Sequence, residues 1–293
     1  MDLLQTVIDA IALGVLYALV AMGIGLIFGV MRLVNFAQGE LIAVGAYTLF
    51  VTKQYPVAVR VVAALSVVVL LAIAMELAYR PLRRATAATM LVATFAVSFL
   101  LQNALLFIFG PQGESIDFLP ELNRAIDFGE LRIRWITIIS IVLGGAILAA
   151  MSWLLARTSV GLQMRAAAAD FRTAQILGVR AGYVIRIAFL LGGLLTAVVS
   201  LVLAVQRPLV TPTYGFLVLV PALVGVVVGG LGRLVPATLG GFTIGFATVV
   251  LNDFLPSGSR VFLNSLLFGI VIVVLLARPA GLFAGRTHVE ERV

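Results

Sequence analysis

Long apolar runs recur along this chain, and they restrict its fold more than any other feature. Stretches of roughly 18–25 residues, the length that an α-helix needs to cross a bilayer core, follow one another along the whole sequence. Barrel strands would be shorter and would alternate between apolar and polar residues. Because the chain is 62% hydrophobic and only 11% charged, a water-soluble globule could not bury its apolar surface. The sequence therefore predicts an all-α, polytopic helical membrane protein.

The apolar runs predict a single transmembrane domain over 1–293 with eight or nine membrane-spanning helices. Three of the runs are short or rich in glycine, so both counts stay open. The expected spans are about 6–30, 39–52, 57–79, 87–109, 135–156, 184–205, 216–231, 234–251 and 261–277.

Arginine and lysine are divided unevenly between the two sets of connecting loops. One set holds 13 of the 20 basic residues and the other holds 7. Because basic residues gather in cytoplasmic loops, we expect the loop at about 157–183 and the C-terminus in the cytoplasm, and the loop at about 110–134 outside. The net charge of +7 then reflects contact with the lipid bilayer and not with nucleic acid. The expected location is the cell (plasma or inner) membrane, with multiple passes.

Several kinds of chemistry lack the residues that they need. The chain has no cysteine, and its one histidine, His288, lies in the polar tail, so neither a thiolate nor a histidine metal site is expected. The one lysine, Lys53, does not follow a glycine-rich turn, so there is no Walker A loop for ATP. No G-x-S-x-G sequence is present. We expect no metal, no directly bound cofactor and no enzymatic activity.

One charged, alanine-rich stretch, "RAAAADFRTAQILGVRAGY" (165–183), interrupts the apolar sequence. A helix over 163–177, ended by Gly178 as a C′ residue, is expected, and it is too short and too charged to cross a membrane. It would rest on lipid as an interfacial helix, or it would dock in a protein groove with Met164 and Phe171 as anchors. Its apolar stripe consists of Met164, Ala167, Phe171, Ala174 and Leu177.

An internal similarity links two segments at a constant offset of 201 residues. "GVMRLVNFAQGELIAVGA" (29–46) aligns with "GLGRLVPATLGGFTIGFA" (230–247). Structural repeats are common in transporters, but apolar sequence of low complexity also matches by chance. Both explanations stay open.

Five segments together resemble one family. "SVGLQMRAAAADFRTAQILGV" (159–179) is similar to the cytoplasmic loop of permeases in branched-chain amino-acid (LIV-type) ABC importers. "LYALVAMGIGLIFGVMRLVNFAQGELIAVGAY" (16–47) resembles the N-terminal signature of the LivH-like permeases, although a histidine is more usual at Gln38. The segments 80–102, 228–245 and 277–285 also match, so the resemblance covers nearly the whole chain.

The resemblance implies a permease subunit that lacks its own ATPase. It implies that Arg165 to Gly178 form a coupling helix, and that ATP and Mg²⁺ bind to partner chains. The implied partners are two ATPase subunits, a second, LivM-like permease subunit and an extracytoplasmic solute-binding protein. Branched-chain amino acids are the family's default cargo, and urea or short amides stay open. The residues expected to couple to the ATPase are Gly161, Met164, Arg165, Ala168, Asp170, Phe171, Arg172, Ala174, Leu177 and Gly178.

Polar residues within or beside the apolar spans are candidates for the translocation path or gate. Asn35 and Gln38 also fit a helix N-cap with a capping box, and Glu40 would favour the N-terminal end of the same helix. Gln102 and Asn103, well inside a span, either bond between helices or line the path. The path and gate candidates are Asn35, Gln38, Glu40, Gln102 and Asn103.

Glu76 has a simple explanation, because it lies four residues before Arg80 and an i,i+4 ion pair is expected. An ion-coupled secondary transporter is the alternative function, and Glu40 or Glu76 would then carry the proton.

Overall fold

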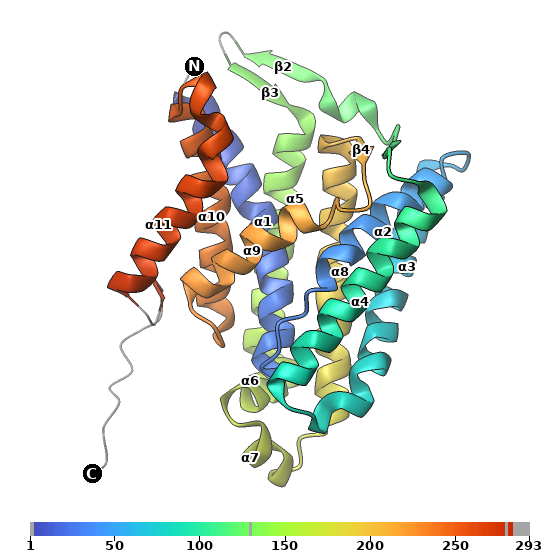
Figure 1. Ribbon diagram of the computed structural model, residues 1–293, viewed down its shortest axis with the longest axis vertical. Helices are drawn as coiled ribbons and strands as arrows, with labels where there is room; N and C mark the ends of the chain where they lie inside the picture. The colour runs from blue at the N-terminus through green and yellow to red at the C-terminus, as the bar shows by residue number, and fades with distance from the viewer. Residues whose placement is uncertain (1–2, 129–130, 279–280, 284–293) are drawn as a thin grey trace.

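A computed structural model describes residues 3–128, 131–278 and 281–283 of the protein. It confirms an all-α architecture: helices fill the bundle, and the strands are short (Figure 1). Nine apolar helices lie close to the expected spans. They are α1 (Leu3–Met31), α2 (Gln38–Val51), α3 (Val57–Tyr79), α4 (Ala87–Phe109), α5 (Trp135–Arg157), α8 (Ala181–Gln206), α9 (Phe216–Gly229), α10 (Leu234–Phe254) and α11 (Leu263–Ala277).

Within the described residues, seven helical stretches are long and apolar enough to cross a membrane, α11 reaching this length together with the preceding turn, as Gly258–Ala277. The other two, α2 and α9, have 14 residues each. Each follows a non-helical segment, at 32–37 and at 207–215. Seven candidate spans are therefore found where eight or nine were expected, and the two short helices account for the difference.

The remaining elements lie at the two ends of the bundle. The helices α6 (Ser159–Ala169) and α7 (Phe171–Ile176) form one end, opposite the N-terminus (Figure 1). Two short antiparallel pairs lie at the other end. They are β1 (Glu114–Ser115) with β4 (Leu209–Val210), and β2 (Ala125–Phe128) with β3 (Leu131–Arg134).

Local sequence explains several helix boundaries. Pro56 precedes α3, where its missing N–H removes no helical hydrogen bond. Thr86 caps α4 by accepting a hydrogen bond from the backbone N of Thr89 at 3.3 Å. Thr158 caps α6 by accepting from the backbone N of Gly161 at 3.2 Å. These short-range signals make the boundaries predictable from sequence.

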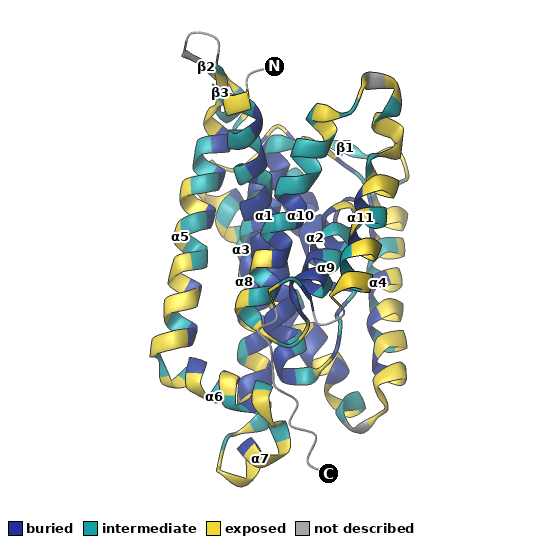
Figure 2. Cartoon of the chain, turned by 90° about the vertical axis from the view of Figure 1, so that its left-hand side faces the viewer, coloured by how far each residue is buried: buried dark blue, intermediate teal, exposed yellow. Residues whose placement is uncertain are grey.

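The core surrounds α1 and α8, and the outer helices turn apolar faces away from it. In its most apolar stretch α1 is 83% buried, whereas α4 is 17% buried and α11 is 11% buried (Figure 2). Large apolar side chains such as Phe107 and Leu276 are exposed on these outer helices. Such surface is stable in lipid or against another apolar helix, and not in water.

The chain contains an inverted structural repeat in which α1–α4 correspond to α8–α11. The second unit begins 178 residues after the first, at Ala181 against Leu3, and α9 begins 178 residues after α2. The spacing is 177 between α3 and α10 and 176 between α4 and α11. The 3₁₀ helices Arg80–Arg84 and Ser257–Phe262, which precede α4 and α11, keep the same spacing of 177.

Packing follows the same repeat. α1 packs along α10 as α8 packs along α3, and α2 packs on α8 as α9 packs on α1. α1 and α8 run in opposite directions through the bundle, so the two units are inverted relative to one another (Figure 1). The similarity at an offset of 201 residues is therefore not the structural repeat, because it pairs the α1–α2 connection with the α9–α10 connection.

The two short helices meet at their N-terminal ends. A Cβ added to Gly215, which precedes α9, would lie 1.8 Å from the backbone oxygen of Gly39 in the first turn of α2. The two backbones are therefore in direct contact, and only glycine fits at position 215.

We predict that Gly215→Ala destabilises the protein by about 1–3 kcal/mol, because the added methyl group must push α2 and α9 apart. Thermal unfolding in detergent measures the change. Gly145→Ala is the matched control, because nothing lies within 4 Å of the added methyl on α5. Equal unfolding temperatures for the two variants would show that this contact is not tight.

Candidate functional site

The charged segment forms two helices, not the single helix expected over 163–177. At Asp170 the backbone has φ −147° and ψ 106°, which ends α6 and begins α7. The Asp170 carboxylate accepts hydrogen bonds from the backbone N of Arg172 at 3.0 Å and of Thr173 at 3.1 Å. This N-cap outweighs the helical propensity of the preceding alanines, and it explains the break.

The C-terminal end of the segment was predicted correctly. Gly178 has φ +90°, a conformation that side chains other than glycine rarely adopt. Its N–H donates to the oxygen of Gln175 at 3.0 Å, and the N–H of Val179 donates to the oxygen of Ala174 at 2.9 Å. Gly178 therefore ends the helix as a C′ residue.

The start of the segment is also fixed by a close contact. A Cβ added to Gly161 would lie 2.2 Å from the backbone oxygen of Leu155 near the end of α5. The connection between α5 and α6 therefore turns sharply, and it requires glycine at this position.

Four of the five stripe residues face the protein's own bundle, whereas Leu177, the last one, is exposed. Met164, Ala167 and Ala174 are no more than 3% exposed, and Phe171 is half-buried against the core. In this chain alone, Met164 is not accessible to a partner, and Phe171 packs against the core. The physical reason is that neighbouring helices of the same chain, α1, α5 and α8, already pack against α6.

Other side chains form the outer surface of α6 and α7. Ile176 and Leu177 are each 79% exposed, and Leu162 is 61% exposed. Arg165, Asp170 and Arg172 are exposed beside them. Sequence periodicity missed Leu162 and Ile176, because both lie off the stripe. We call Leu162, Arg165, Arg172, Ile176 and Leu177 the outer face of the segment.

A second group of functional candidates lies deep inside the chain. Asn35 is 2% exposed, and Gln38 and Glu40 are fully buried. The expected capping box is wrong: α2 begins after Ala37, which has no side-chain cap. Gln38 instead donates through Nε2 to Oγ1 of Thr196 on α8 at 3.2 Å, and Asn35 accepts from the Tyr79 hydroxyl at 3.3 Å. Contacts with α8 and α3, distant in sequence, replace the local ones.

Glu40 lies in the first turn of α2, as expected for an acid that favours a helix N-terminus. Its Oε1 accepts from the Ser98 hydroxyl on α4 at 3.1 Å. The carboxylate therefore lies at the positive end of α2 and is held toward α4. Its Oε2, like Oε1 of Gln38 and Nδ2 of Asn35, has no hydrogen-bond partner among the described residues.

The ion pair of Glu76 differs from the expected one. The partner is Arg83 and not Arg80. The reason is the 3₁₀ helix Arg80–Arg84, which turns the chain back so that Arg83 reaches the buried Glu76 carboxylate.

Gln102 and Asn103 do not join the buried group. Gln102 is half-buried on α4, and Asn103 is exposed on the outer side of that helix. Asn103 donates through Nδ2 to the backbone oxygen of Phe99 at 2.7 Å. An exposed amide within an apolar span is unfavourable in lipid, so this side of α4 is a candidate for contact with water or a partner.

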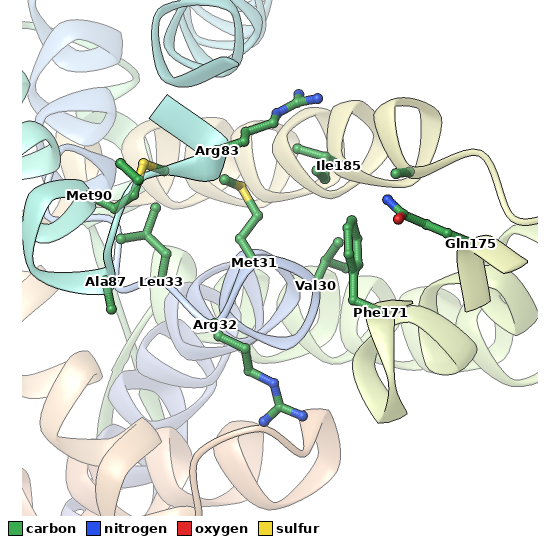
Figure 3. Close-up of a pocket in the computed structure, with 12 residues that line it drawn as sticks. Val30, Met31, Arg32, Leu33, Arg83, Ala87, Met90, Phe171, Gln175 and Ile185 are labelled. Atoms are coloured by element: carbon green, nitrogen blue, oxygen red, sulfur yellow. The ribbon is translucent and has the colours of Figure 1, made fainter. Parts of the chain in front are cut away.

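Two cavities lie at the α6–α7 end of the bundle. One, of about 570 Å³, lies between α1, α7, α8 and the start of α4, and Figure 3 shows Phe171, Gln175 and Ile185 at its wall. The other, of about 810 Å³, lies between α6 and the start of α10, and Arg32, Arg165 and Arg233 line it. Arg32 lines both cavities.

Apolar helices in an inverted repeat, a few buried polar side chains and a charged helical segment at one end are typical of a multi-pass membrane permease. The chain matches the family described as "Branched-chain amino acid transport system / permease component" over residues 6–276, and it belongs to that family. It is 29% identical to the high-affinity branched-chain amino acid transport system permease protein BraD of Pseudomonas aeruginosa. That alignment covers 98% of this chain and 97% of BraD.

Two further comparisons agree. The chain is 28% identical to the permease protein LivH of Escherichia coli K12, with 98% of this chain and 97% of LivH covered. Its fold is similar to a chain in the structure of PsaBC from Streptococcus pneumoniae in complex with a Fab. The TM-score is 0.50 at 16% identity, covering 93% of this chain and 90% of that chain. This second likeness concerns the fold alone.

Asp170 yields a prediction about the two-helix segment. The Thr173 side-chain and backbone hydrogen bonds, with lesser help from Arg172, lower the pKa of the Asp170 carboxyl. A lowered pKa means that the cap stabilises α7 above the carboxyl's ordinary pKa and that this stabilisation is lost as the pH falls. We expect Asp170→Ala to speed hydrogen exchange over residues 171–177, whereas Asp170→Asn, which keeps an acceptor, has a smaller effect.

Hydrogen–deuterium exchange at neutral pH measures both variants. In the unchanged protein, exchange over the same residues should rise as the pH is lowered toward 3, after correction for the intrinsic rate. Equal protection in all three proteins would rule out Asp170 as the cap.

Proposed function

We propose that this chain is a permease subunit of an ATP-driven ABC importer that carries branched-chain or similar amino acids. The observation that carries the proposal is the family match over 6–276, joined to a short, exposed, two-helix segment at one end of the bundle. BraD and LivH, with which the chain aligns along nearly its full length, are named as permeases of branched-chain amino acid transport systems.

The outer face of the α6–α7 segment is suited to docking an ATPase subunit. Ile176 and Leu177 offer exposed apolar contacts at the tip, and Arg165 and Arg172 offer charges around them. Apolar anchors surrounded by polar groups are typical of the energetically important centres of interfaces. ATP and Mg²⁺ would bind to two such partner chains, and this end and the C-terminus would then lie in the cytoplasm.

The path for cargo would lie between this chain and a second permease subunit. Residues that line such a path must be accessible from outside the single chain, and Asn103 on α4 meets that condition. Asn35, Gln38 and Glu40 do not, because each is at most 2% exposed. We therefore propose that these three support α2 from inside the chain. The exposure of Gln102 is intermediate between theirs and that of Asn103. An external solute-binding protein would deliver the cargo at the opposite end.

The docking proposal predicts that Leu177→Ser weakens ATPase retention about tenfold or more, because a truncated interface anchor typically costs 1–2 kcal/mol or more. Co-purification from membranes measures retention. The folded permease should be unaffected, since this side chain contacts solvent in the isolated chain. Tyr55→Ser, an exposed site between α2 and α3 at the other end, is the control. Full retention in Leu177→Ser would contradict the docking face.

Glu40 separates the proposed importer from an ion-coupled transporter. If Glu40 only supports the helix ends, Glu40→Gln should keep most of the uptake and lower the unfolding free energy by about 0.5–2 kcal/mol. Uptake of radiolabelled leucine into proteoliposomes and thermal unfolding measure the two effects. Glu121→Gln in the 110–134 loop is an exposed control.

Loss of uptake in Glu40→Gln, with normal assembly and ATP hydrolysis, would favour proton transfer by Glu40. The same proteoliposomes identify the cargo. ATP-dependent uptake of leucine, isoleucine or valine supports the proposal. Uptake of urea or a short amide alone would show that the cargo is one of these compounds and not an amino acid.

A further inference from the structure

Arg32 follows the last residue of α1 and connects three parts of the α6–α7 end. Its backbone N–H closes the last turn of α1 by donating to the oxygen of Phe28 at 2.7 Å. Its Nη2 donates to the backbone oxygen of Ala168 on α6, also at 2.7 Å. On its other side, a Cβ added to Gly232 in the α9–α10 turn would lie 2.8 Å from Nη1.

The bond to Ala168 satisfies a group that α6 leaves unpaired. In an uninterrupted helix the Ala168 oxygen would accept from the N–H of Arg172. That N–H instead donates to the Asp170 carboxylate, because α6 ends there. The last carbonyl groups of a helix carry partial negative charge, and a guanidinium is a strong partner for them. The break at Asp170 and the contact with Arg32 therefore depend on one another.

The backbone of Arg32 is strained in a way that supports this contact. Its φ is +53°, and Arg32 is one of two described residues other than glycine with positive φ. Such a conformation costs free energy in an L-residue and persists where surrounding contacts hold it. Gly232, with φ +89°, provides the space on the facing turn.

Empty space surrounds this contact on both sides. The cavities of about 570 Å³ and about 810 Å³ both include Arg32 in their walls. Figure 3 shows the guanidinium pointing away from the smaller cavity. Around Arg32, α6 and α7 are therefore separated from α4 and α10 by open volume, and Arg32 bridges the gap between α6 and the α9–α10 turn.

The chain continues from Arg32 directly into the buried polar group. Residues 33–37 are not helical, and Leu33, Asn35 and Ala37 are buried. Thr94 donates to the oxygen of Val34 at 3.2 Å, and the next residue after Ala37 is Gln38 at the start of α2. A displacement of Arg32 therefore acts on α1, on α2 and on the α9–α10 turn together.

We infer that Arg32 is a positioning residue that makes α6 move together with the end of α1 and the α9–α10 turn. This inference rests on the proposed function, since the displacement would begin with an ATPase docked on the outer face of the segment. Packed elements joined by specific bonds transmit displacement when they have discrete arrangements. Without the Arg32 bond, α6 would be joined to the bundle only by its packing on α1, α5 and α8, and its displacement would reach the α9–α10 turn less fully.

The first experiment measures solute transported per ATP hydrolysed in proteoliposomes that contain the complete importer. Arg32→Gln should keep ATP hydrolysis and lower this ratio about tenfold, which lies within the usual range of coupling between sites. Arg32→Lys should restore part of the ratio, because an ammonium still donates to the Ala168 oxygen. Arg233→Gln is the control, since Arg233 lines the same cavity and should leave the ratio unchanged.

The second experiment replaces the Arg32 bond with a covalent one. A Cβ added to Gly29 would lie 3.7 Å from Cβ of Ala168, a separation that suits a disulfide. The chain has no cysteine, so the pair Gly29→Cys and Ala168→Cys can be introduced alone. In the Arg32→Gln background, oxidation should restore the ratio and reduction should lower it again. In the unchanged background, oxidation should leave the ratio intact.

Several outcomes would overturn the inference. The first is an unchanged ratio of solute transported to ATP hydrolysed in Arg32→Gln. The second is that Arg32→Gln loses hydrolysis and uptake equally and is also less thermally stable. The third is that the oxidised cysteine pair fails to restore the ratio in the Arg32→Gln background. Loss of uptake on oxidation in the unchanged background would show that α6 must slide against α1, which also refutes it. Failure of the proposed function is distinct, because then the unsubstituted chain would neither retain an ATPase nor import solute.

Discussion

The crossing of α1 and α8 is the contact on which the rest of the structure depends. At this crossing, a Cβ added to Gly192 would lie 3.4 Å from the backbone oxygen of Gly23. In a membrane, where water does not drive helices together, such close packing of small residues is a main source of helix association. Because α10 and α9 pack on α1, and α3 and α2 pack on α8, both halves of the repeat are assembled around this crossing.

This arrangement brings parts of the two non-helical segments 32–37 and 207–215 into the interior, and backbone groups along both segments are paired. The backbone oxygen of Val34 accepts a hydrogen bond from the Thr94 hydroxyl, and that of Val210 accepts one from the Tyr47 hydroxyl. The backbone oxygen of Pro208 accepts from the N–H of Ile116. Irregular backbone at membrane depth is tolerated where protein surrounds it. The interior polarity of the chain thus has a structural origin before any role in transport.

Much of the fold could be predicted from sequence, because the signals are local. The predicted spans 57–79 and 87–109 match α3 and α4, since Pro56 and the Thr86 cap mark their starts. Contacts over long separations could not be predicted. Gln38 bonds to Thr196 rather than to its own helix end, and the stripe of Met164 packs inward. The inverted repeat keeps the order and spacing of its elements but little residue identity, so a comparison of the amino-acid sequence found a different offset.

The helix α5 belongs to neither half of the repeat, and its presence has a topological consequence. Each half, α1–α4 or α8–α11, begins and ends at the same end of the bundle (Figure 1). A second copy joined directly to the first would therefore start on the same side and stand in the same orientation. A single additional crossing by α5 turns the second copy upside down. The antiparallel symmetry of the whole protein thus depends on the parity contributed by one 23-residue helix.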